Sequence, residues 1–444
     1  MTSTSQKLLL LAVAFTLQAV SLSPYYSYGQ LFTALKQESG HASGSLALIG
    51  SLRDLTISFG SVFVALLLRF DRFGPARSVE LGSVSLVLGM LLDGVAPSPW
   101  WLFLSYSLIS GLGLAMIFCP AATLLYGRLE GWQLPVAVGL ASAGGGAGTI
   151  AVNSAMEVLL KLGWRSTQQI LAGAYAVLLI PCCLVLRCLL KSEGTSQTNP
   201  KQPMGCDVKA LLRPFLELKF MLFSVCVLLY IATSMIPFTH LVFYARDALD
   251  YENAAGLISV AGLGSILGRI SSGVLATVIP ASWIFAALVL LQGGVFFWLP
   301  FCETWQLTAF SMIYGVSSGV RVALLTLVVA ELFGAQRVQA LYCLLGLPMG
   351  LGLVAGPPLA GLVFDLTGSY QAAFLGSGAA MVALLPLLAL ILFRHCREHR
   401  DQRHVGSGER RDESVAESVG SPKSPLAELN FQSDSEGPHE NSLA

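Results

Sequence analysis

The sequence predicts an all-α polytopic membrane protein with twelve transmembrane helices, and three observations support this fold class. Hydrophobic residues make up 54% of the 444 residues and charged residues only 12%, against about 25% charged in typical soluble domains. Apolar runs long enough to cross a bilayer, about 20 residues each, recur along the chain. One long polar segment, residues 191–215, divides these runs into six and six. A transmembrane β-barrel would show weak alternating segments instead.

The six spans before the polar segment are apolar runs bounded by polar or turn residues. They are expected at residues 8–35, 45–68, 78–96, 100–125, 134–160 and 170–190. Residues 1–190 are therefore predicted to form an N-terminal six-helix bundle.

A linker at residues 191–215 leads into a second predicted six-helix bundle, residues 216–394. Its spans are expected at residues 218–244, 254–278, 283–301, 305–331, 339–364 and 371–393. Residues 395–444 contain few large apolar residues, so they bury too little surface to fold and are predicted to be a disordered cytoplasmic tail.

The distribution of Lys and Arg predicts the orientation, because cytoplasmic loops carry an excess of these residues. With both termini in the cytoplasm, the inside loops and the start of the tail hold sixteen Lys and Arg residues. The outside loops hold four, namely Lys36, Lys161, Arg165 and Arg246. We therefore expect a multi-pass protein of the plasma membrane with a cytoplasmic linker and cytoplasmic termini.

Arg269 lies near the middle of the apolar stretch from Ala254 to Ile279. An Arg at the centre of a lipid-facing helix costs about 2.5–3.5 kcal/mol on insertion scales, so this side chain is expected to face the protein interior. Helical spacing places Ser265 and other small residues on the same face, which leaves room beside the charge. The pattern predicts an anion site. The alternative is an ion pair with a fixed carboxylate on another helix.

Arg321 is predicted to lie at a depth similar to that of Arg269. It precedes Glu331, at the cytoplasmic end of the tenth span, by ten residues, which corresponds to about 15 Å of helix. The two Arg residues could together clamp a carboxylate or dicarboxylate. Alternatively, one binds substrate while the other pairs with an acid.

Arg53, Asp54 and His240 are further ionisable residues within the predicted spans. Arg53 and Asp54 are neighbours in the second span, where they could form a gating pair near the outer mouth or both reach the outer interface. His240 lies in the outer third of the seventh span. Its unperturbed pKa near 6.5 would suit proton sensing, and the alternative is a hydrogen-bonded structural His.

Glycine motifs predict close contacts between helices. Gly264-x-x-x-Gly268 lies in the eighth span, GGGAG at residues 144–148 in the fifth, and Gly346-x-x-x-Gly350 in the eleventh. Small residues at this spacing let two helix backbones approach each other.

Nothing in the sequence indicates nucleic-acid binding or catalysis. The net charge is zero, whereas nucleic-acid-binding domains carry a basic excess. The nine Cys residues show no metal-ligand spacing, and the sequence contains neither a Gly-x-x-x-x-Gly-Lys-[Ser/Thr] motif nor a nucleophile–base set. We therefore expect no enzyme activity, no metal site and no cofactor.

The segment RFDRFGPAR, between the second and third spans, resembles the Gly-x-x-x-Asp-Arg-x-Gly-Arg motif of the major facilitator superfamily. The matching residues are Asp71, Arg72, Gly74 and Arg77. With the six-plus-six pattern, this resemblance implies two pseudo-repeats and a substrate site between them at mid-depth. It also implies that Asp71 and Arg72 belong to a charge clasp that locks one conformation. The alternative for the Arg residues is simple positive-inside anchoring.

Four stretches carry a narrower resemblance, to orphan-type members of the monocarboxylate transporter family. They are SYGQLFTAL with the second span and RFDRFGPAR, VAVGLASAGGGAG with GWR, Arg269 in the eighth span, and GPPLAGLVFDLTGSYQAAF at residues 356–374. The resemblance implies a symporter or facilitative carrier of the cell membrane that moves a small organic anion, a monocarboxylate, by alternating access. Arg269, Arg321, Tyr26 and Ser265 would be its substrate-binding residues.

The chain departs from the proton-coupled lactate carriers of that family at two positions. Tyr26 stands where they have a Lys in the first span, and Ser265 where they have an Asp one turn before the Arg. We therefore expect transport to depend only weakly on a proton gradient. The resemblance leaves open protons as co-substrate and a single-span accessory glycoprotein as partner. The alternative function is a transport-inactive relative that acts as a scaffold or regulator through its tail.

Overall fold

The computed structural model describes residues 4–39, 43–68, 74–192, 213–251 and 254–419. Within these ranges every named element is a helix, in agreement with the predicted class. The chain divides into two compact units, Met1–Leu392 and Phe393–Ala444. The first unit contains the two halves described below.

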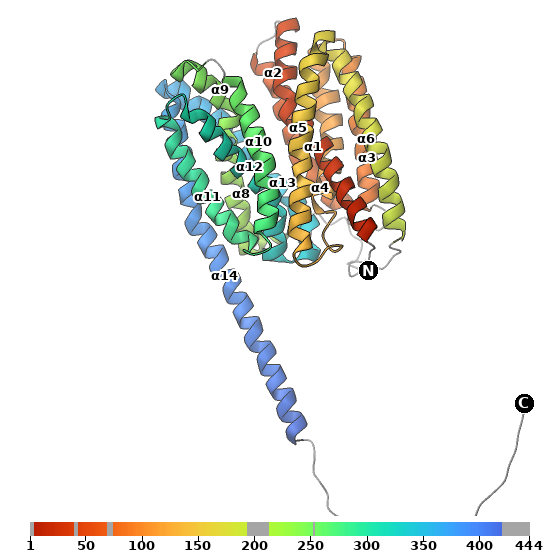
Figure 1. The fold of residues 1–444 in the computed structure, drawn as a ribbon, viewed down its shortest axis with the longest axis vertical. Coiled ribbons are helices and arrows are strands. Elements are labelled where there is room, and N and C mark those ends of the chain that lie inside the picture. Colours follow the sequence, from red (N-terminus) through yellow and green to blue (C-terminus); the bar gives the residue numbers. More distant parts are fainter. Residues whose placement is uncertain (1–3, 40–42, 69–73, 193–212, 252–253, 420–444) are drawn as a thin grey trace, which may run out of the picture. The chain divides into compact units, whose positions relative to one another are not determined.

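The N-terminal half consists of the helices drawn from red to yellow in Figure 1. They are α1 (Thr4–Ser39), α2 (Ser43–Leu67), α3 (Pro75–Gly94), η1 (Pro99–Trp101), η2 (Phe103–Ile109), α4 (Ser110–Thr123), α5 (Gln133–Leu159), η3 (Leu160–Leu162) and α6 (Trp164–Ser192). The element η2 is a π-helical segment, so the predicted fourth span is not a uniform α-helix.

The C-terminal half begins after the linker, most of which lies outside the described residues. Its elements are η4 (Arg213–Leu216), α8 (Leu218–Ser234), α9 (Ile236–Leu249), α10 (Ala254–Leu275), α11 (Ala281–Trp298), η5 (Leu299–Phe301), α12 (Gln306–Phe333), η6 (Ala335–Arg337), α13 (Val338–Thr367) and α14 (Tyr370–Val419). The predicted seventh span is divided into α8 and α9 at Met235. Pro237 follows this break, where a residue without an amide hydrogen is tolerated because it lies in the first turn of a helix.

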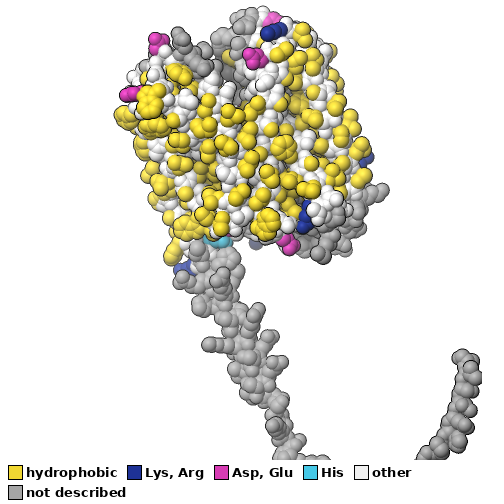
Figure 2. Space-filling model, in the orientation of Figure 1, with side chains coloured by type: hydrophobic (Ala, Val, Ile, Leu, Met, Phe, Trp, Pro, Cys, Tyr) yellow, Lys and Arg dark blue, Asp and Glu magenta, His cyan; other side chains and the backbone are white. Residues whose placement is uncertain are grey.

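Twelve segments of the described residues are long and apolar enough to cross a membrane, which confirms the predicted fold class. They are Thr4–Phe32, Leu48–Leu67, Pro75–Gly94, Pro99–Thr123, Gln133–Leu162, Trp164–Leu189, Leu218–Val242, Gly256–Leu275, Ala281–Phe301, Gln306–Phe333, Ala335–Phe364 and Tyr370–His395. Figure 2 shows hydrophobic side chains over the sides of the helices, and most of the visible charged side chains near their ends. Such a surface suits a hydrocarbon solvent.

Helix α14 continues to Val419, which differs from the predicted disordered tail beginning at residue 395. The stretch from Arg394 to Val419 contains no Pro and several Arg and Glu residues, which are good helix formers, and these outweigh the poor helix formers Gly406 and Gly408. Residues 420–444 lie outside the described residues. The predicted domain boundaries stay a prediction.

Glycine-lined contacts join the helices, as the motifs predicted. A Cβ at Gly264 would lie 2.6 Å from the backbone oxygen of Met312, so α10 packs closely against α12. Across the two halves, a Cβ at Gly139 of α5 would lie 2.7 Å from the backbone oxygen of Arg269 in α10. A Cβ at Gly350 of α13 would lie 2.5 Å from the Cβ of Ser58 in α2. The first unit is therefore held together by two close seams between the halves, α5 with α10 and α2 with α13.

Candidate functional site

Arg269 lies in the seam between α5 and α10, and its side chain is buried, with 1% exposed. Its Nε donates a hydrogen bond to Oγ of Ser265, one turn earlier in α10, over 3.3 Å. Its Nη1 donates to the backbone oxygen of Ser142 in α5 over 2.6 Å. Among the described residues no carboxylate forms an ion pair with Arg269. The guanidinium is thus fixed to both halves of the protein by neutral oxygen acceptors.

The glycine run of α5 makes room for this guanidinium. A Cβ at Gly145 would lie only 2.6 Å from Nη1 of Arg269. Ser142 lies one turn before Gly145, and its carbonyl points to the same group. Ser142 and Gly145 belong to the site although the sequence indicated only a packing role for this stretch. The sequence did contain a signal for this role: a serine, Ser142, lies two residues before the run GGGAG in the fifth span, where small residues leave space for a large side chain.

Arg321 of α12 is a second buried cation, with 5% of its side chain exposed. Its Nε has no hydrogen-bond partner in the described part of the chain. Tyr230, Tyr314 and Tyr342 interact with it electrostatically, and so does Arg269. Two buried guanidinium groups therefore share one region without a described carboxylate between them, which makes this region electropositive.

Tyr26 and Ser265, the two other residues predicted to bind substrate, both lie beside Arg269, and their substrate-binding role stays a prediction. Tyr26 interacts electrostatically with Arg269 and with Tyr314. Its ring lies 5.9 Å from that of Phe238 in α9, which in turn lies 4.9 Å from the ring of Tyr314. The region thus has a positive centre bordered by hydroxyl groups and aromatic rings, which suits a small anion with an apolar part.

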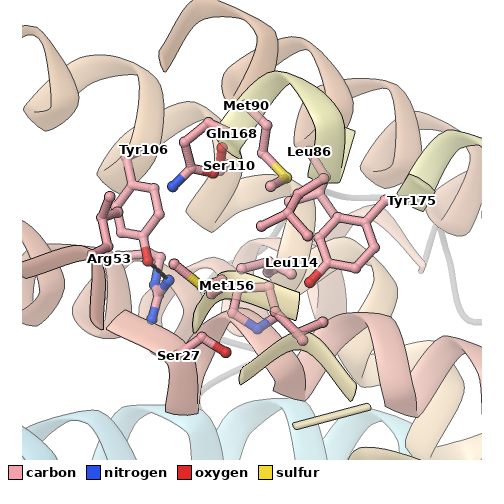
Figure 3. Close-up of a pocket in the computed structure, with 14 residues that line it drawn as sticks. Ser27, Arg53, Leu86, Met90, Tyr106, Ser110, Leu114, Met156, Gln168 and Tyr175 are labelled. Atoms are coloured by element: carbon pink, nitrogen blue, oxygen red, sulfur yellow. Dashed lines mark hydrogen bonds between the residues drawn. The ribbon is translucent and has the colours of Figure 1, made fainter. Parts of the chain in front are cut away.

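Arg53 lies elsewhere, inside the N-terminal half, and is 1% exposed. It donates through Nη1 to the hydroxyl of Tyr106, and its guanidinium carbon lies 4.6 Å from the centre of that ring. Nη2 lies 3.5 Å from Oδ1 of Asp54. Figure 3 shows the guanidinium directed at Tyr106 in a cavity that Ser27 and Gln168 also line. Arg53 is therefore an interior residue, and the gating role of the pair stays a prediction.

Asp93 is an ionisable residue that the sequence reasoning missed. It is fully buried at the end of α3, accepts a hydrogen bond from Oγ of Ser105 through Oδ1, and interacts electrostatically with Arg53. Its Oδ2 has no partner among the described residues. The signal was an acidic residue within the apolar run LVLGMLLDG. The buried residues Arg53 and Asp93 and the partly exposed Asp54 therefore form one charge cluster, separate from Arg269.

His240 of α9 is held by two hydrogen bonds. Its Nε2 lies 2.9 Å from the backbone oxygen of Pro357, and its Nδ1 lies 3.1 Å from the hydroxyl of Tyr370. A neutral ring satisfies both contacts, because Nε2–H donates to the carbonyl while Nδ1 accepts from the tyrosine. The two other predicted gating residues, Asp71 and Arg72, lie outside the described residues.

Comparison with known proteins gives concordant results. The sequence model of the Major Facilitator Superfamily matches residues 8–304 and 257–431. The chain is 31% identical to monocarboxylate transporter 13 of Bos taurus over 380 residues, which cover 83% of this chain and 85% of the relative. It is 30% identical to monocarboxylate transporter 11 of Homo sapiens over 387 residues, or 84% and 80% of the two chains.

Among solved structures, the fold is similar to that of FucP, a Major Facilitator Superfamily transporter crystallised in the outward conformation. The TM-score is 0.66, the sequence identity is 16%, and the match covers 86% of this chain and 97% of FucP. At this identity the likeness concerns the fold.

Proposed function

Because this chain belongs to the monocarboxylate transporter family of the major facilitator superfamily, we propose that it carries a small organic anion, a monocarboxylate, across the plasma membrane by alternating access. The observation that carries this proposal is the buried guanidinium of Arg269, which is held by Ser265 and Ser142 and has no described carboxylate partner. Transport is secondary-active or facilitative, and both termini are cytoplasmic.

The charge of Arg269 requires a counter-ion when water is excluded. A buried cation without a partner is costly, because it loses its hydration and the low-dielectric interior does not replace it. Nε of Arg269 already donates to Ser265, and one hydrogen of Nη1 donates to Ser142. The Nη2 group therefore remains to donate to a ligand. A carboxylate would supply both the negative charge and the acceptor atoms that a guanidinium fork binds best.

Arg321 supplies a second positive charge near the same place. One carboxylate between the two guanidinium groups would interact with both of them. A dicarboxylate would neutralise both, and the substrate panel below distinguishes these classes. Tyr26 and Tyr314 provide apolar rings for the remainder of the substrate.

Contacts between the halves support alternating access. At the predicted cytoplasmic ends, Oγ of Ser61 in α2 donates to the backbone oxygen of Cys343 in α13 over 2.6 Å. The rings of Phe118 in α4 and Tyr342 in α13 lie 6.1 Å apart. These contacts join the two halves on the predicted cytoplasmic side, and in the proposed mechanism they would separate when the substrate leaves toward the cytoplasm.

Uptake by the purified full-length protein in liposomes tests the proposal. The panel contains labelled lactate, succinate and phenylalanine, with lactamide as a control that matches lactate in shape but lacks its charge. We expect uptake of at least one carboxylate and none of lactamide. If no carboxylate enters, the proposal is wrong and a role as a transport-inactive scaffold or regulator is favoured.

A further inference from the structure

The cavity drawn in Figure 3 lies inside the N-terminal half, and each of the helices α1 to α6 contributes to its wall. Its volume is about 20 Å³. A space of roughly 10–15 Å³ is enough for one water molecule. The cavity therefore has room for one water molecule and none for an organic anion such as lactate. Arg269 is not among the residues of the wall, so this cavity is separate from the candidate anion site.

Two buried polar side chains of the wall have an atom without a hydrogen-bond partner among the described residues. They are Gln168 of α6, through Oε1, and Ser110 at the start of α4, through Oγ. Each residue is 2% exposed. A buried polar atom that loses water without gaining another partner is costly. These two atoms therefore favour a ligand that forms hydrogen bonds with both of them.

The hydroxyl groups elsewhere on the wall are already paired. The hydroxyl of Tyr106 accepts a hydrogen bond from Arg53. The hydroxyl of Tyr175 lies 2.8 Å from Oγ of Ser23, and Oγ of Ser27 donates to the backbone oxygen of Ser23 over 2.6 Å. The two unpartnered atoms are therefore the ones to which a ligand in the cavity would bind.

The charges beside the cavity favour a neutral ligand. Arg53 also lines the cavity, and its Nη2 lies 3.5 Å from Oδ1 of Asp54. Because this carboxylate compensates the guanidinium, an anion would meet no excess positive charge, and a cation would be repelled by Arg53. A water molecule carries no charge and both donates and accepts hydrogen bonds. It can donate to Oε1 of Gln168 and either donate to or accept from the hydroxyl of Ser110.

We infer that this cavity is a binding site for one water molecule, which bridges Oε1 of Gln168 and Oγ of Ser110. Helix α3 leaves space for the serine hydroxyl, because a Cβ at Gly89 would lie 2.2 Å from Oγ of Ser110. A bridging water is nearly as favourable in enthalpy as a direct hydrogen bond, so it holds α4 and α6 together. The inference depends on the fold of the N-terminal half and not on the proposed transport.

Radiolytic footprinting of the full-length protein in liposomes tests the inference. A short X-ray pulse converts water into hydroxyl radicals, which oxidise neighbouring methionines. Met90 of α3 and Met156 of α5 line the cavity and are buried, so bulk water does not reach them. Mass spectrometry should show sulfoxide at Met90 or Met156 at least about tenfold faster than at Met381, which is buried in α14 outside the cavity. Equal rates at all three would mean that the cavity binds no water.

Variants of the two bridged side chains provide a second test. Gln168→Leu removes the amide at nearly constant volume and should slow the oxidation of Met90 and Met156 at least threefold. Gln169→Leu is the matched control, because Gln169 is the exposed neighbour in α6, and it should oxidise like the wild type. Ser110→Ala serves as a second variant if Gln168→Leu does not fold, and it should slow the oxidation at least twofold. Unchanged oxidation in the folded variants would overturn the inference.

Thermal unfolding distinguishes one shared water from two separate roles. Because the same water serves both side chains, either single substitution removes the bridge. The double variant Gln168→Leu/Ser110→Ala should therefore lower the unfolding midpoint by clearly less than the sum of the two single effects. Additive effects would contradict the bridge. Neither measurement needs a substrate, so absent uptake in the wild type would bear only on the proposed function.

Discussion

The guanidinium of Arg269 and the backbone carbonyl of Ser142 lie 2.6 Å apart, although 127 residues separate them in the chain. This hydrogen bond joins α10 to α5 and so connects the two halves at the candidate anion site. A neutral acceptor orients the guanidinium but leaves its charge uncompensated. Any movement of one half against the other must change this contact, which gives a direct link between anion binding and conformational change.

Replacing Arg269 should abolish carboxylate transport while leaving the protein in the membrane. Hydrogen bonds to charged groups contribute about 1.5–3 kcal/mol, and 1.4 kcal/mol is about tenfold in affinity, so Arg269→Ala should lower uptake at least about tenfold. Surface labelling in cells checks expression. Arg337→Ala is the matched control, because that Arg forms an exposed ion pair with Glu217. Unchanged uptake by Arg269→Ala would remove this residue from the site.

A side chain at Gly145 should displace the guanidinium. The added Cβ of Gly145→Ala would lie 2.3 Å from Cδ1 of Leu22 and 2.6 Å from Nη1 of Arg269. Both distances are shorter than real Cβ contacts, so the Leu22 side chain and the guanidinium must both shift. We expect uptake by Gly145→Ala to be several-fold lower than uptake by the wild type at the same amount of protein in the membrane. Gly173→Ala in α6 is the control, because a Cβ there meets no atom within 4 Å. Equal uptake by both variants would contradict the assigned contact.

Loss of Arg53 should destabilise the N-terminal half. Removing one partner of a buried charge pair costs about 3–5 kcal/mol, and Arg53→Met would leave Asp54 and Asp93 without their positive neighbour. Thermal unfolding of the purified protein should show a clearly lower midpoint. Arg337→Met should change the midpoint little, because Arg337 forms an exposed ion pair with Glu217 and surface ion pairs contribute about 0–1 kcal/mol. Similar midpoints for both variants would mean that the cluster around Arg53 carries little net stability.

Transport should depend weakly on a proton gradient. Tyr26 borders Arg269, and Oγ of Ser265 accepts a hydrogen bond from it; these are the positions where the proton-coupled relatives are expected to carry ionisable groups. Uptake at external pH 6.0 and 7.5 should therefore differ less than about twofold, because neither position carries the Lys or the Asp expected in the proton-coupled carriers. A pH-sensitive dye inside the liposomes provides the second measurement. Strong acidification with substrate would contradict this expectation and direct attention to Asp54, Asp93 and His240.

Much of the fold and part of the site could be predicted from the sequence. Span length and hydropathy determined the twelve helices, because each span must satisfy its own backbone hydrogen bonds in the bilayer. The cost of a charge in lipid identified Arg269 and Arg321 as interior residues, and both are buried. Helical periodicity placed Ser265 beside Arg269, since residues four apart share a face.

Only the tertiary structure decided which residues meet across helices. Periodicity shows which side of one helix is buried, but not which helix covers it or at what height. It therefore could not show that Ser142 accepts from Arg269 or that Asp93 interacts with Arg53. Those relationships follow from how far each helix is shifted along its neighbour, and close contacts at glycines such as Gly139 fix that shift.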